Sequence, residues 1–128
     1  MRMKYIDIQN EVIKDYNINI VENSTCRMRT HAHCDGSRRI CKWKQHNSIR
    51  STFDLFHEIG HIMTYKTSMR RCESEYHATV WALEKVKEYD LIVPPDLLDK
   101  YQAYIYLELE RGKRRGGKHY PTIEDLKI

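Results

Sequence analysis

The segment from Phe53 to Met63 constrains this chain more than any other, because it joins a helical hydrophobic pattern to a fixed spacing of polar residues. It reads Phe-Asp-Leu-Phe-His-Glu-Ile-Gly-His-Ile-Met. Ser51, with Asp54 three residues later, is the expected N-cap pair of this helix. Apolar residues recur at intervals of three and four, which predicts an amphipathic helix: Phe53, Phe56, Ile59, Ile62 and Met63.

Two histidines and a glutamate on this helix form a candidate metal site. His57 and His61 lie one turn apart on the same face, so both rings can offer a nitrogen to one ion. Glu58 is rotated by about 100° from His57, which places its carboxylate beside the open position of the metal. Zinc is the expected metal, since it lowers the pKa of bound water to roughly 7 and a nearby carboxylate can take the proton. The alternative is a chance spacing in a chain with seven histidines, and the helical context favours the metal site.

A third ligand is expected from the next predicted helix, which runs from Cys72 to Tyr89. Glu75 is the preferred candidate, because it shares a face with small residues of the kind found where two helices approach closely. Glu73 lies on another side of this helix and is the weaker candidate. Cys72 could supply a fourth protein ligand, which would make the site structural because catalytic zinc sites keep one position open. The face of Glu75 also contains Ala78, Thr79, Ala82 and Val86.

The remaining hydrophobic pattern predicts an α+β fold, mainly helical, with a small antiparallel sheet. Alternating apolar residues indicate strands, and three- to four-residue intervals indicate helices. The last helix is expected to bury Leu97, Leu98, Tyr101, Tyr104, Ile105 and Leu109. The expected elements are a helix over 6–16 capped by Asp7 or Asn10, a strand over 17–23, a loop or hairpin over 24–38 with a turn at Asp35-Gly36, an edge strand over 39–44 with Cys41 and Trp43 on one face, the motif helix ending near Lys66, and a helix over 96–111 ended by Gly112.

Length and composition predict one domain over residues 1–128, with 111–128 as a basic, flexible tail. No signal-peptide pattern and no run of eighteen apolar residues occurs, so we expect a cytoplasmic protein without membrane association. In that compartment the four cysteines are expected to be reduced thiols.

The net charge of +4 is concentrated in two basic stretches, 24–50 and 111–118. Such stretches can attract nucleic acid, but no recognised DNA-reading motif accompanies them, so solvated surface is favoured. A second metal site is a weaker hypothesis, because the spacing lacks paired Cys-x-x-Cys units. Its candidate ligands are Cys26, His31, His33, Cys34 and Cys41.

Residues 53–94 resemble the ImmA/IrrE family of zinc metallopeptidases found in phages and mobile elements. Three blocks carry the resemblance: Phe53-x3-His57-Glu58-Ile59-Gly60-His61, Glu75-x-x-Ala78-x-x-Trp81-Ala82, and Leu91-Ile92-Val93-Pro94. The resemblance implies that zinc is bound by His57, His61 and Glu75 and that Glu58 is catalytic. It also implies a protein substrate such as a separate helix-turn-helix repressor. Two departures are Thr79, where the family often has Asn or Asp, and the segment 26–41.

Two functions therefore compete. The first is a zinc endopeptidase, in which Tyr65, Tyr76 or His77 could stabilise an oxyanion and the strand over 39–44 could hold an extended substrate by strand addition. The second is a zinc-stabilised regulator or toxin-like protein that binds nucleic acid or a partner protein without catalysis.

Overall fold

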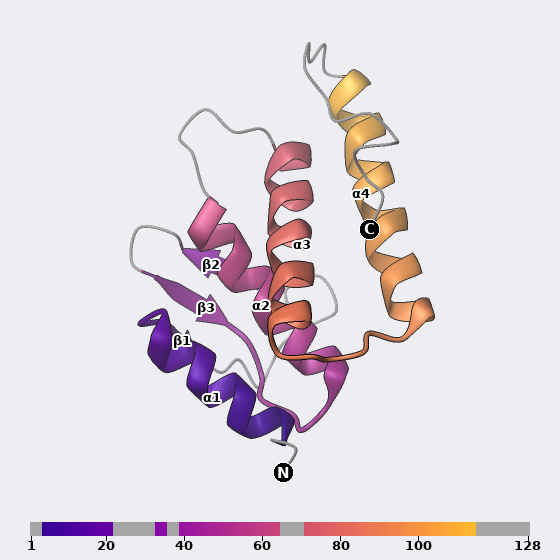
Figure 1. Ribbon diagram of the computed structural model, residues 1–128. Coiled ribbons are helices and arrows are strands. Elements are labelled where there is room, and N and C mark those ends of the chain that lie inside the picture. Colours follow the sequence, from indigo (N-terminus) through magenta and orange to yellow (C-terminus); the bar gives the residue numbers. More distant parts are fainter. Residues whose placement is uncertain (1–3, 22–32, 36–38, 65–70, 115–128) are drawn as a thin grey trace.

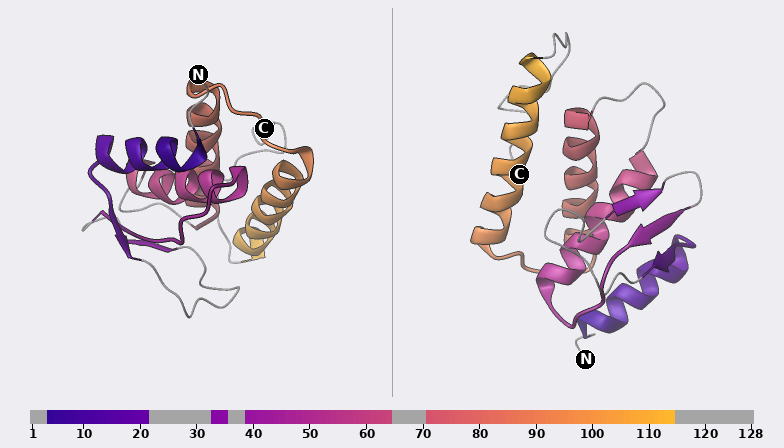
Figure 2. Two further views of the ribbon diagram at one scale, coloured as in Figure 1. Left: turned by 90° about the horizontal axis from the view of Figure 1, so that it is seen from below. Right: turned by 180° about the vertical axis from the view of Figure 1, so that it is seen from behind.

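A computed structural model of the chain describes residues 4–21, 33–35, 39–64 and 71–114, and the structural statements below refer to these residues. Helix α2 lies centrally and contacts α1, α3, β2 and β3. The sheet and α1 lie on the side of α2 away from α4, and α3 packs against both α2 and α4 (Figures 1 and 2). The elements in chain order are α1 (Tyr5–Asp15), β1 (Asn19–Val21), β2 (His33–Asp35), β3 (Ile40–Lys42), α2 (Ile49–Thr64), α3 (Arg71–Glu88) and α4 (Pro95–Arg114).

The sheet has three strands in the order β1-β3-β2. Strand β3 is antiparallel to β2, with Cys34 opposite Cys41, but parallel to β1, with Ile20 opposite Cys41. The expected antiparallel sheet is therefore wrong for β1. The short connection between β2 and β3 requires these two strands to run in opposite directions, and β3 then inserts beside β1 in the parallel sense.

Strand β3 is central, so the expectation of an edge strand over 39–44 is also wrong. Its two neighbours occupy the edges of the sheet. The expected shared face is confirmed, since Cys41 and Trp43 are both buried while Ile40 is only partly so. The indole Nε1 of Trp43 donates a 2.9 Å hydrogen bond to the carbonyl oxygen of Ser51 and attaches the strand to α2.

Helix α2 begins earlier than its expected cap. Ser48 is the residue before the helix, and its Oγ accepts a 3.1 Å hydrogen bond from the backbone N–H of Ser51. Ser51 is buried inside the first turn and donates from its own Oγ to the carbonyl oxygen of Lys44. The predicted cap of α1 is wrong as well, because Lys4 occupies that position and makes no side-chain cap bond.

Two helices end in residues with positive φ, as is common at helix C-termini. Asn17 follows α1 with φ 53° and Asp90 follows α3 with φ 54°. Pro95 begins α4, where its fixed φ suits the first turn of a helix. Helix α4 continues through Gly112 to Arg114, so Gly112 does not end it and residues 111–114 belong to the helix. The rest of the expected tail lies outside the described residues.

The core is built around α2, and one glycine allows α3 to approach it closely. A Cβ atom added at Gly60 would lie 2.6 Å from the carbonyl oxygen of Ala78 and 3.0 Å from its Cα. These atoms belong to the backbone of α3 and cannot rotate away. The buried hydrophobic residues that surround this contact include Phe53, Leu55, Phe56, Ile59 and Ala82.

We expect Gly60→Ala to lower the free energy of unfolding by about 1–3 kcal/mol, because the added methyl group separates two packed backbones. At a solvent-exposed position within a helix, the same change would raise the free energy of unfolding by about 1 kcal/mol. Exposed Ala103 on α4 provides the control, since Ala103→Gly should lower the free energy of unfolding only by the difference in helix propensity between alanine and glycine. Urea denaturation of both variants measures the effect, and a stabilised Gly60→Ala variant would contradict the close contact.

Candidate metal centre

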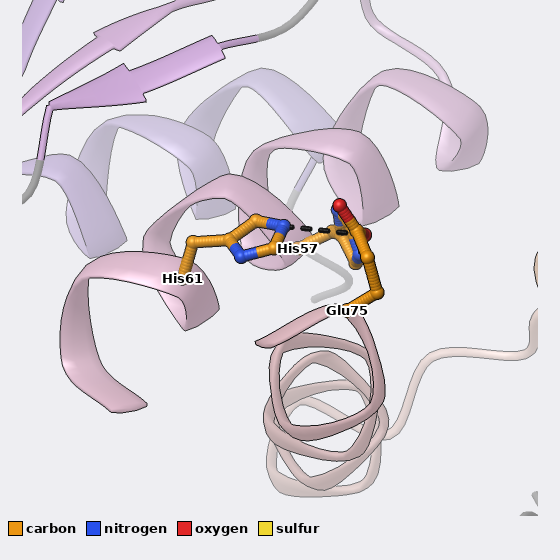
Figure 3. Close-up of side chains that lie close together, drawn as sticks. All are labelled: His57, His61 and Glu75. Atoms are coloured by element: carbon orange, nitrogen blue, oxygen red, sulfur yellow. Dashed lines mark ion pairs between the residues drawn. The ribbon is translucent and has the colours of Figure 1, made fainter. Parts of the chain in front are cut away.

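Three side chains from two helices converge at the junction of α2 and α3. His57 and His61 extend from α2 towards Glu75 of α3 (Figure 3). The Oε2 atom of Glu75 lies 3.1 Å from Nε2 of His57 and 3.3 Å from Nε2 of His61. One ligand atom from each residue lies within 4.8 Å of the other two, so the group could hold a metal ion.

The α3 face predicted from sequence is the face that packs on α2. Ala78, Thr79 and Ala82 are fully buried, and Glu75 is 9% exposed. The hydroxyl group of Thr79 donates a 2.9 Å hydrogen bond to the carbonyl oxygen of Glu75, so this buried polar side chain is satisfied within the helix. Glu73 is partly exposed and lies outside the convergent group. The side chain of Cys72 lies outside the described residues.

The polar atoms of this group fit a metal ion better than they fit one another. Nε2 of His57 and Oε2 of Glu75 are buried without a hydrogen-bond partner, although they face each other at 3.1 Å. Buried polar atoms are usually satisfied, because leaving one unpaired costs about 1–3 kcal/mol. A cation bound between the two imidazoles and the carboxylate would satisfy both atoms.

Ser74 is a neighbour of the convergent group that the sequence did not indicate. Its Oγ lies 2.8 Å from Nδ1 of His61. A partner on Nδ1 fixes the plane of the ring and leaves Nε2 as the nitrogen facing Glu75. The residue directly precedes Glu75, but one serine within a predicted helix gives no signal of this role.

Glu58 is buried beside the group without joining it. Its side chain is 9% exposed, and its Oε1 lies 3.6 Å from Nδ1 of His57. The 100° rotation expected between neighbouring helix residues therefore separates it from the three convergent donors. This position leaves the carboxylate close to the site and outside the set of metal donors.

The metal-free site holds a buried charge pair. Burial alone would lower the pKa of His57, but pairing with the carboxylates of Glu58 and Glu75 outweighs burial and raises it to about 9. Burial alone would raise the pKa of Glu75, but the two histidines lower it to about 2. Both shifts stabilise the folded state. The contribution of His57 is lost as pH rises from 6.5 towards 9, and that of Glu75 is lost as pH falls from 4.5 towards 2.

Other residues singled out from the sequence lie apart from this group. The ring of exposed His77 packs against Tyr76 with centroids 5.3 Å apart, and neither belongs to the convergent donors. Tyr65 lies outside the described residues. Cys41 is buried in the central strand, while the other candidate ligands of a second metal site lie outside the residues whose side chains are described.

One residue of the first basic stretch has a structural partner. Arg39 donates from Nε to the carbonyl oxygen of Tyr16 at 3.1 Å, which places its charge at the C-terminus of α1. Its guanidinium group therefore helps to attach β3 to α1. The basic residues at 115–118 lie outside the described residues.

Comparisons with family models, curated proteins and solved structures found no match. Within the described ranges, no helix is both long and apolar enough to cross a membrane. What the structure itself supports is a mainly helical fold whose two-histidine helix and glutamate helix form a group able to bind a metal.

We expect the affinity of the site for zinc to rise about tenfold per pH unit between pH 6.5 and 9, because His57 must release its proton to bind. Competition with a coloured chelator at several pH values measures this slope. His77→Gln is the matched control, since that exposed ring should leave the slope unchanged. An affinity independent of pH in this range would show that His57 is already neutral without metal.

We expect Ser74→Ala to weaken zinc binding by about 10-fold or more, because His61 loses the partner that orients its ring. The control is Thr64→Ala, which removes a hydroxyl group that bonds only to the carbonyl oxygen of Gly60 one turn earlier. Equal affinities for both variants in the same chelator assay would argue against the role of Ser74.

Proposed function

We propose that this protein is a zinc-dependent endopeptidase. The observation that supports the proposal best is the convergence of two imidazoles and one carboxylate, with a second buried carboxylate beside them. Catalytic zinc sites typically have three protein ligands, including the His₂Glu set, and keep the fourth position open. The same donor chemistry is the reason to prefer zinc over other divalent ions.

Each residue then has a separate role. His57, His61 and Glu75 would hold the ion, and a bound zinc ion would supply Lewis-acid activation of water and of the peptide carbonyl group. Glu58 would accept a proton from the attacking water at one carboxylate oxygen and return it to the leaving amine nitrogen. Ser74 would keep Nε2 of His61 directed at the ion.

The substrate that we propose is a regulatory protein. The reason is the resemblance of the motif blocks to the ImmA/IrrE family, whose members are linked to cleavage of repressors in phages and mobile elements. A separate helix-turn-helix repressor, acting with this protein in the cytoplasm, is the preferred candidate. Nucleic acid remains a secondary partner candidate, on the basis of the two basic stretches.

A non-enzymatic role is the second candidate, and the burial of the site favours it. The side chains of the three donors are only 9–13% exposed. Structural zinc sites are closed, whereas a peptidase must admit a peptide bond to the metal. In this alternative the ion would stabilise the junction of α2 and α3 in a regulator or toxin-like protein.

Substitutions at the two classes of residue separate these functions. We expect Glu75→Gln and His61→Ala to lose zinc, because each removes a donor from the convergent group. We expect Glu58→Gln to retain about one zinc ion yet to lower cleavage by about 10²–10⁴-fold, because it removes the proton acceptor. Metal analysis and cleavage of a repressor encoded nearby, co-expressed with each variant, provide the two measurements.

Glu73→Gln is the matched control, since it makes the same chemical change on the same helix outside the convergent group. It should retain both zinc and activity. If Glu58→Gln holds zinc and behaves as wild type in every assay, the structural alternative is correct. Wild-type protein that binds no zinc would contradict both functions.

A further inference from the structure

A tyrosine from the last helix reaches the metal centre and contacts a single turn of α2. The hydroxyl group of Tyr101 donates a hydrogen bond to Oδ1 of Asp54. Its ring lies 5.1 Å from the ring of His57 and 4.8 Å from that of Phe53, measured between centroids. All three contacts fall within five consecutive residues of α2, although Tyr101 lies more than forty residues further along the chain.

The two histidines of the site are oriented by different means. Nδ1 of His61 has Ser74 as a partner at 2.8 Å. Nδ1 of His57 lies 3.6 Å from Oε1 of Glu58, which is longer than a hydrogen bond, and its Nε2 faces Glu75 without a hydrogen bond. Packing against the rings of His61 and Tyr101 therefore adds to the contact of Nε2 with Glu75 at 3.1 Å in fixing the plane of His57.

The position of the Tyr101 ring is itself fixed by the bond to Asp54. A phenol with an ordinary pKa near 10 is protonated in neutral solution, so the hydroxyl group of Tyr101 is available as a donor to Asp54. A protonated donor facing a carboxylate forms one of the stronger classes of hydrogen bond.

We propose that Tyr101 is a positioning residue of the metal centre, anchored by Asp54 and acting through the ring of His57. This inference rests on the proposed metal site. It assigns to α4 a part in metal binding, although α4 contributes none of the three donors. Without the ring, His57 would sample other orientations, and its Nε2 would face Glu75 for a smaller fraction of the time.

The test measures zinc affinity and metal-free stability separately. We expect Tyr101→Leu to weaken zinc binding by about 10–100-fold, the range typical of residues that orient metal ligands. Tyr101→Phe and Asp54→Ala each break the anchor but keep the ring, so both should bind zinc less tightly than wild type and more tightly than Tyr101→Leu. The combination of Tyr101→Phe with Asp54→Ala should be no weaker than either alone, because both remove the same bond.

Two controls distinguish positioning from general support of the fold. Asp54→Asn keeps an oxygen acceptor for the phenol and should bind zinc more tightly than Asp54→Ala. Tyr106→Leu removes a partly buried tyrosine elsewhere on α4 and should leave zinc affinity unchanged, whatever its effect on unfolding by urea. The spectrum of the cobalt-substituted protein should change in Tyr101→Leu and stay as in wild type in Tyr106→Leu.

The outcomes separate this inference from the proposed metal site. If wild type binds zinc and the Tyr101 variants bind it equally well, the inference is wrong and the site stands. Additive losses in the double variant would overturn the anchoring by Asp54. Wild-type protein that binds no zinc would overturn the site and this inference together. If Tyr101→Leu does not fold, the zinc affinities of Tyr101→Phe, Asp54→Ala and Asp54→Asn still decide whether the bond between Tyr101 and Asp54 supports metal binding.

Discussion

The site depends on the distance between two helix backbones. Glu75 has a short side chain, so its carboxylate reaches both histidines only because α3 approaches α2 closely at Gly60 and Ala78. The contact lies inside the motif, where Gly60 directly precedes His61. Fully buried small residues continue this close face along α3, so packing and ligand placement have the same structural cause.

The same closeness makes the metal-free site electrostatically demanding. Two imidazoles and two carboxylates lie in a space with little access to water, and a proton held on His57 offsets part of the negative charge. A divalent cation can replace that proton, and it would also satisfy the two unpartnered atoms. Metal binding and proton release are therefore coupled, as is expected where ligands must be deprotonated.

Each helix that surrounds α2 contributes to the arrangement at a different level. Helix α3 brings a donor and, through Ser74, the partner of His61. Helix α4 brings Tyr101 against His57 and Asp54. On the opposite side, Gln9 of α1 donates from Nε2 to Thr52, which ties α1 to the first turn of α2. The histidine helix is thus held from both sides, and ligands on a rigid helix lose less entropy when they bind a metal.

By itself the sequence determined the presence of the helices, the histidine pair, and the placement of Glu75 rather than Glu73 on the α3 face that packs against α2, because periodicity specifies which residues share a face. It did not determine the parallel pairing of β1 with β3, the capping of α2 by Ser48, or the continuation of α4 through Gly112. Those features, together with the approach of Ser74 and Tyr101 to the histidines, were decided by tertiary structure. The physical reason is that a periodic pattern encodes the direction in which a side chain points, whereas its partner is set by how separate elements pack.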